Sequence, residues 1–191
     1  MNKLALLLAG IVLGHAAHAD DGDLRNAAGA VAGIYASIYV HELGHAAVFA
    51  ANGATDIHIR VPGRQCKLLC GETTAAFPAR PSRATVQASN LAGFASANLA
   101  SELLLQNRSA ARSGFGQGFI AANLYSNAVH VVTYYTRIVG RNGYQGNDID
   151  AYERAGGNPH LLSAGLIAYS AWTLHRMKKK EIPVMFVQLR F

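Results

Sequence analysis

Residues 26–54 read NAAGAVAGIYASIYVHELGHAAVFAANGA and carry a single formal charge, that of Glu42. A helix of about 20 residues crosses the hydrocarbon core of a bilayer, and this stretch is longer. Two further stretches are equally poor in charge: residues 84–105 contain only Glu102, and residues 113–136 contain no charged side chain. The pattern predicts three core helices of membrane length.

A fourth stretch, residues 161–175, is shorter and marginal as a span. Tyr169, Trp172 and the basic residues that follow are side chains that suit the edge of a bilayer. Ala, Gly and Ser are abundant in the first two stretches and allow helices to approach closely. The predicted fold is mainly α, a polytopic membrane helix bundle of three core helices plus the marginal fourth. The alternative is a soluble domain that buries the same helices.

A short β-hairpin is expected directly after the first core helix. Residues 55–61 read TDIHIRV, and this alternation of polar and apolar side chains is typical of a half-buried strand. Pro62 and Gly63 mark a turn, and residues 67–70 form the expected returning strand, with a loop over residues 73–82. The two cysteines, Cys66 and Cys70, form either a small disulfide loop or two thiols.

The length of the chain and its first 19 residues indicate one domain in the cell envelope. Residues 1–19 have a basic start, an apolar centre and a small-residue ending, which predicts a signal peptide or signal anchor before a single domain over residues 20–191. The expected location is the bacterial inner membrane, with the periplasm as the alternative.

The net charge of +6 comes from scattered basic residues without a recognised binding motif, so no nucleic-acid partner is expected. The expected partners are the lipid bilayer and a membrane protein or peptide substrate.

The feature with the clearest chemistry is His41-Glu42-Leu43-Gly44-His45 in the first core helix. Side chains four residues apart lie on one face of a helix, so both imidazoles can bind one Zn²⁺. Glu42 stands beside the first ligand and can take a proton from water as a general base. The motif predicts a zinc site with Glu42 as its catalytic residue.

A catalytic zinc ion needs a third protein ligand, and spacing alone leaves its identity open. For His130, hydrogen bonding between helices together with Asn123 and Asn127 is the preferred interpretation. Asp148 and Asp150 also suit a turn or the N-cap of a short helix over residues 149–155. The candidates are His58, Glu102, His130, Asp148, Asp150, Glu153 and His160.

The chain resembles the site-2-type intramembrane zinc metalloproteases, in particular their small, divergent bacterial relatives. The H-E-L-G-H-A motif of residues 41–46 and the small-residue turn at residues 52–54 are similar to that family's pattern. Residues 91–98 resemble its second motif, with Phe94 in place of proline. Residues 147–149 resemble its third motif, although the glycine expected after the aspartate is missing.

The resemblance implies a fold, a ligand set and a reaction. Asp148 becomes the first choice for the third zinc ligand, followed by Asp150 and then Glu102. The implied activity is zinc-dependent hydrolysis of peptide bonds in membrane-embedded or membrane-adjacent substrates. Asn98 and Asn127 are the implied substrate contacts, with helix–helix hydrogen bonding as the alternative.

Two other functions compete with this interpretation. One is a soluble periplasmic metallopeptidase of the zincin type, with Glu102 as third ligand. The other is a non-catalytic membrane protein that keeps the zinc motif for structure or for partner binding.

Overall fold

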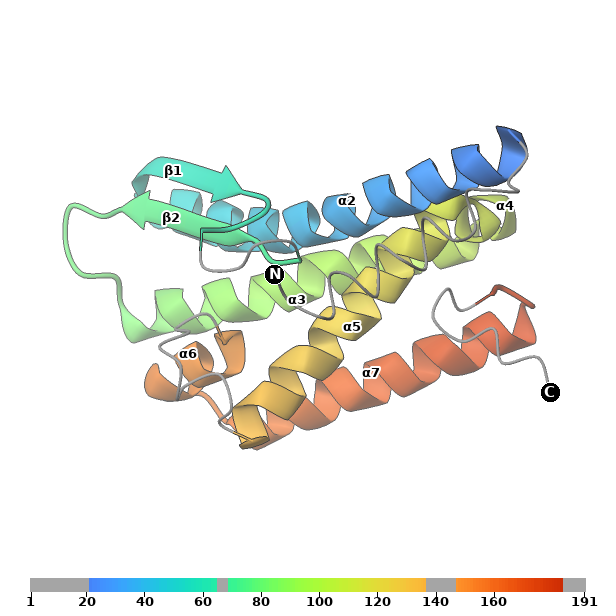
Figure 1. Ribbon diagram of the computed structural model, residues 1–191. Coiled ribbons are helices and arrows are strands. Elements are labelled where there is room, and N and C mark those ends of the chain that lie inside the picture. Colours follow the sequence, from blue (N-terminus) through green and yellow to red (C-terminus); the bar gives the residue numbers. More distant parts are fainter. Residues whose placement is uncertain (1–20, 65–68, 137–146, 184–191) are drawn as a thin grey trace.

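The computed structural model describes residues 21–64, 69–136 and 147–183, and these form a mainly helical fold with one small hairpin (Figure 1). In chain order the elements are α2 (Asp21–Ala51), β1 (Thr55–Arg60), β2 (Glu72–Ala76), α3 (Arg83–Gln106), α4 (Arg108–Arg112), α5 (Gly114–Thr136), α6 (Asp148–Arg154) and α7 (Pro159–Lys179).

Helix α2 packs against both α3 and α5, and α7 packs against α5 and α6 (Figure 1). Glycines set the closeness of these contacts. A Cβ at Gly118 of α5 would overlap the backbone of Ala30 in α2, and a Cβ at Gly33 of α2 would overlap the backbone of Phe115. The α2–α5 contact is therefore one of backbone against backbone, which any larger side chain would separate.

The prediction of a polytopic membrane bundle is wrong. Among the residues described, no helix is both long enough and apolar enough to cross a membrane. The reason is that a stretch without charge is not necessarily an apolar one. In α3, Ser89, Asn90 and Ser101 are buried polar residues, and in α5 the same is true of Asn123 and Asn127. Absence of charge indicated where three helices lie, but it did not report their hydropathy.

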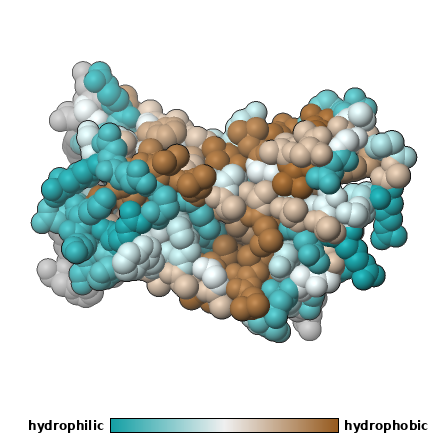
Figure 2. Space-filling model, turned by 180° about the vertical axis from the view of Figure 1, so that it is seen from behind, coloured by the Kyte–Doolittle hydropathy of each residue, from teal (hydrophilic) through white to brown (hydrophobic). Residues whose placement is uncertain are grey.

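Apolar side chains are divided between the interior and the surface. One buried cluster consists of Phe94, Val131, Tyr134, Ile149 and Leu166, and a second of Leu105, Ala111, Ile120, Met177 and Ile182. Large hydrophobic side chains are also exposed, among them Leu99 and Leu103 of α3. Figure 2 shows hydrophobic surface across the middle of one face, with hydrophilic surface towards the ends. Surface of this kind commonly serves in contacts with other molecules.

The hairpin forms where it was expected, but its second strand lies later in the sequence. Strand β2 covers Glu72–Ala76 and pairs antiparallel with β1, with His58 opposite Thr74. The predicted strand over residues 67–70 is not observed at Leu69 and Cys70, and part of the predicted loop over 73–82 is strand. The β-branched threonines of β2 favour extended backbone, which accounts for the shift. Cys70 is disulfide-bonded, and Cys66 lies outside the described residues.

Two glycine substitutions of the same kind should change stability in opposite directions. Gly118→Ala should lower the free energy of unfolding by about 1–3 kcal/mol, because the added methyl meets the Ala30 backbone. Gly165→Ala in α7 has open space around its new Cβ and should raise stability by about 0.5–1 kcal/mol. Chemical denaturation of both variants tests this, and equal effects would contradict the close α2–α5 contact.

Candidate metal centre

Helix α2 presents His41 and His45 side by side on one buried face. Their Nε2 atoms lie 3.1 Å apart, and their ring centroids 4.9 Å apart. Glu42 is buried next to them, and the ligand atoms of all three side chains lie within 4.8 Å of one another. The spacing of the motif thus produces a buried His–Glu–His group that can hold a metal ion.

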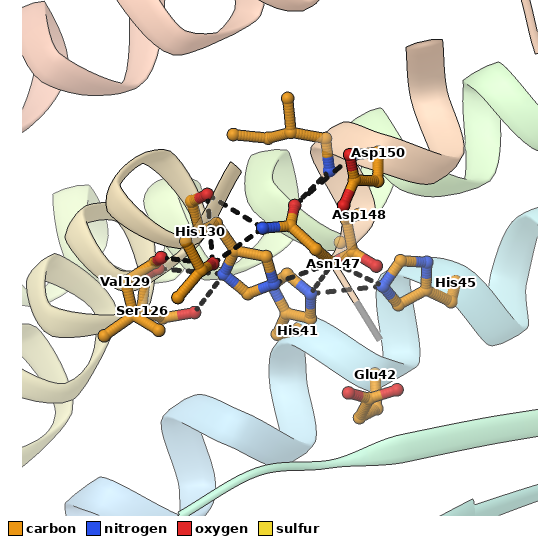
Figure 3. Close-up of polar contacts among 12 residues, drawn as sticks. His41, Glu42, His45, Ser126, Val129, His130, Asn147, Asp148 and Asp150 are labelled. Carbon is orange, nitrogen blue, oxygen red and sulfur yellow. Dashed lines mark hydrogen bonds and ion pairs between the residues drawn. The ribbon is translucent and has the colours of Figure 1, made fainter. Parts of the chain in front are cut away.

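A carboxylate from the far end of the chain reaches the two histidines. Asp148, the first residue of α6, places Oδ2 2.8 Å from Nε2 of His41 and 3.4 Å from Nε2 of His45. Figure 3 shows its carboxylate directed towards both rings. The structure therefore brings together the two helix-borne histidines and the aspartate that the resemblance had put first.

A third histidine joins this group from α5. Nε2 of His130 lies 3.4 Å from Oδ2 of Asp148, and His41, His130 and Asp148 form a second group able to hold a metal. For His130 the sequence favoured a hydrogen bond between helices. Its position in an uncharged stretch was a usable signal, because a titratable group buried there needs a partner.

Asn147 holds the start of α6 against α5. Its amide nitrogen donates to the carbonyl of His130 at 2.9 Å and to Oγ1 of Thr133 at 2.7 Å. Its amide oxygen caps α6 by accepting from the backbone N–H of Ile149 at 2.9 Å. Asn147 is 4% exposed. One buried side chain thereby sets the position of Asp148 relative to His130.

Helix α3 forms the wall behind the histidines. A Cβ at Gly93 would lie 2.6 Å from Nε2 of His45 and 2.9 Å from Nε2 of His41, so only glycine leaves these atoms free. Phe94, which stands where the resembled family has proline, meets His41 and His130 edge to face at centroid distances of 5.2 and 5.0 Å. Gly93 therefore leaves space at the two nitrogens, and Phe94 orients the rings of His41 and His130.

Burial lowers the pKa of His41, which outweighs the opposing effect of Asp148 and favours the neutral ring. Burial opposes ionisation of Asp148, but the charge of His45 and the contacts with His130 and His41 lower its pKa well below the usual range. A metal ion needs an ionised carboxylate and an imidazole lone pair. Asp148 and His41 already offer these forms. At His45 and His130 burial is outweighed by Asp148, which raises the pKa of both, so that these two rings must release a proton to bind a metal.

Strand β2 covers the carboxyl group of Glu42. Oγ1 of Thr73 is 2.7 Å from Oε2 of Glu42 and 3.1 Å from its backbone oxygen. A Cβ at Gly71 would overlap the same carboxyl group. In Figure 3 Glu42 lies on the side of α2 towards the hairpin, apart from the cluster around Asp148. The hairpin therefore orients the candidate base, whereas helices orient the candidate ligands.

Glu102 lies elsewhere in the bundle. It forms an ion pair with Arg176 of α7, and its Oε1 is buried without a hydrogen-bond partner. Glu102 belongs to neither of the metal-binding groups that the described residues form. The same holds for the remaining sequence candidates, His58, Asp150, Glu153 and His160.

The two asparagines expected to contact substrate lie between helices. Nδ2 of Asn127 in α5 donates to Oδ1 of Asn98 in α3 at 3.1 Å, and Nδ2 of Asn123 donates to the same oxygen at 2.9 Å. The hydroxyl of Tyr169 in α7 donates to the carbonyl of Asn98. The observed contacts match the alternative that the sequence left open, namely hydrogen bonding between helices.

Filling the space at Gly93 should displace the histidines. Gly93→Ala should abolish metal binding or weaken it at least tenfold, because the new methyl overlaps the two Nε2 atoms. Gly165→Ala, the same change in a helix with free space, should bind metal like the unchanged protein. Titration of both variants with Zn²⁺ measures the effect, and full affinity in Gly93→Ala would contradict a site at these nitrogens.

Two helix caps offer a matched pair of substitutions. Asn147 caps α6 and Asn158 caps α7 through the same kind of side-chain oxygen. Asn158→Ala should cost about 1 kcal/mol of stability, and Asn147→Ala should cost more, because it also removes the buried bonds to His130 and Thr133. Only Asn147→Ala should also weaken metal binding, about 10–100-fold, because it alone positions Asp148. Thermal unfolding and Zn²⁺ titration separate the two effects, and equal metal affinity in both variants would refute the positioning role.

The chain was compared with protein-family models, with curated proteins and with solved structures, and none of them matches it. The resemblance to site-2-type proteases accordingly remains a prediction from short motifs. The structure itself shows a buried group of histidine and acidic side chains that can hold a metal ion.

Proposed function

We propose that the chain is a zinc-dependent peptidase, with His41, His45 and Asp148 holding the metal and Glu42 as the general base. The observation that carries the proposal is the convergence of two Nε2 atoms and one carboxylate oxygen from α2 and α6. Their separations are 2.8, 3.1 and 3.4 Å. Tetrahedral ligands at about 2.0–2.1 Å from zinc lie roughly 3.3 Å from one another, so a small shift of these side chains would accommodate the ion.

The donor set favours zinc or another transition metal over calcium and magnesium. Imidazole nitrogen and a single carboxylate oxygen are ligands typical of Zn²⁺. Calcium and magnesium favour shells made of oxygen atoms, which this cluster does not supply. The free space beside Gly93 lies at the two Nε2 atoms, where the ion would be held.

The chemistry follows from the position of Glu42 beside the ligands. Zinc supplies a Lewis acid that polarises a peptide carbonyl and makes water a better nucleophile. Glu42, held by Thr73, takes the proton from the attacking water and passes it to the leaving amine. Its carboxyl group meets the requirement that a base lie within reach of the metal-binding atoms.

The proposed substrate is a peptide bond, without reference to a membrane. The membrane-embedded substrate depended on a spanning bundle, and none of the helices formed by the described residues is both long and apolar enough to cross a membrane. The soluble zincin alternative depended on Glu102 as third ligand, but Glu102 is paired with Arg176 away from the histidines. Asp148 therefore supplies the carboxylate in the proposed site.

Metal content and hydrolysis should respond differently to two substitutions. The purified full chain should bind one zinc ion and cleave a mixed peptide library. His41→Ala should lose the zinc, because it removes a ligand. Glu42→Gln should keep the zinc and lose about 10²–10⁴-fold in hydrolysis, because only the base is removed. Elemental analysis and mass spectrometry of the cleaved peptides measure both properties.

Two exposed residues provide controls. His58→Ala in β1 and Glu153→Gln in α6 should leave zinc content and hydrolysis unchanged. A chain that retains no stoichiometric zinc would refute the proposed site. Undiminished hydrolysis by Glu42→Gln would refute the role of the base while leaving the metal site intact.

A further inference from the structure

Oδ2 of Asp148 faces three imidazoles, one more than the proposed ligand set uses. His41, His45 and His130 place their Nε2 atoms 2.8, 3.4 and 3.4 Å from this one oxygen. The rings of His41 and His130 are stacked, with centroids 5.8 Å apart. Three imidazole nitrogens from α2 and α5 thus surround one carboxylate oxygen of α6.

The hydrogen bond at the other side of the His130 ring indicates which of its nitrogens is free to bind a metal. Nδ1 lies 2.8 Å from the carbonyl oxygen of Ser126. A carbonyl only accepts hydrogen bonds, so Nδ1 carries the hydrogen and a neutral ring keeps its lone pair on Nε2. Histidines that bind metals usually make such a bond with their second nitrogen. His130 therefore presents a ligand atom towards Asp148.

When the imidazoles are neutral, hydrogen bonds alone leave this geometry poorly satisfied. When the His130 ring is neutral, the lone pair on its Nε2 and the oxygen of Asp148 are two acceptors 3.4 Å apart. Nε2 of His41 and Nε2 of His45 also lie 3.1 Å apart, and both face the same carboxylate oxygen. One divalent cation bound between these side chains would take up the imidazole lone pairs and the carboxylate charge together.

His130 and Asp148 are also held together as a unit. The side chain of Asn147 binds the backbone oxygen of His130 at 2.9 Å and is itself the residue before Asp148. Phe94 packs edge to face on His130 as it does on His41. The contacts that orient a proposed ligand thus orient His130 as well.

We infer that His130 is a fourth protein ligand of the metal, so that His41, His45, His130 and Asp148 close the site in its resting state. The inference rests on the metal site of the proposed function and adds how the access of water to that site is regulated. A catalytic zinc ion keeps one position for water, whereas four protein ligands fill a tetrahedral shell. Water gains access only when His130 withdraws or the shell expands to five ligands.

X-ray absorption at the zinc edge counts the imidazoles directly. The zinc-loaded full chain should show three imidazoles and one oxygen ligand. His130→Ala should show two imidazoles, with water in the vacant position, and its zinc affinity should fall at least tenfold. His130→Gln keeps a side chain of similar length without an imidazole and serves if the alanine variant does not fold. His160→Ala is the control. It removes an imidazole that contacts Tyr135 on the surface, so the zinc ion should still show three imidazole ligands.

The possible results separate this inference from the proposed function. Two imidazoles on zinc in the unchanged protein would overturn the role of His130 and leave the peptidase proposal standing. Three imidazoles that persist in His130→Gln would overturn it as well, because another histidine would then be the ligand. Absence of bound zinc would refute both proposals.

Discussion

The contact between Asp148 and the histidines of α2 is the constraint on which the arrangement of the site depends. Two residues 107 positions apart in the chain meet at 2.8 Å. The Asp148 side chain is only 17% exposed, so its charge needs partners that replace water. The imidazoles provide them, and their proximity keeps the pKa of Asp148 low despite burial. The position of α6 at the end of α3 and α5 follows from this requirement.

Small residues where α2 and α3 meet make the contact between Asp148 and the histidines possible. Gly93 leaves space for the two Nε2 atoms, and a Cβ at Gly44 of α2 would overlap the backbone of Ala92 in α3. Ser96 donates to the carbonyl of Val40 at 2.8 Å across the same boundary. The helices therefore approach closely where the motif lies, and larger side chains there would separate the histidines from Asp148.

The candidate base belongs to a different part of the structure from the candidate ligands. Glu42 is oriented by Thr73 of the hairpin, whereas Asp148 is oriented by the cap and tether of Asn147. A change in the hairpin can thus alter the base without moving the metal-binding atoms. The separation also explains why the two roles can be tested independently, with metal content reporting on one set of residues and hydrolysis on the other.

By itself, the sequence determined what depends on neighbours along the chain. The spacing of His41 and His45 places both on one helix face, and the charge-poor stretches mark where the long helices form. The absence of charge did not show whether these stretches are apolar enough to cross a membrane. The predicted second strand also lay too early in the sequence.

Only the tertiary structure decided which distant residues join the pair. Asp148, Glu102 and His130 were all chemically suitable, and the sequence contains no distance between them. The packing of α5 and α6 against α2 and α3 brought Asp148 and His130 to the site, while the pairing with Arg176 kept Glu102 away. Local geometry is set by bonds along the backbone, whereas the approach of separate helices is set by which surfaces fit together.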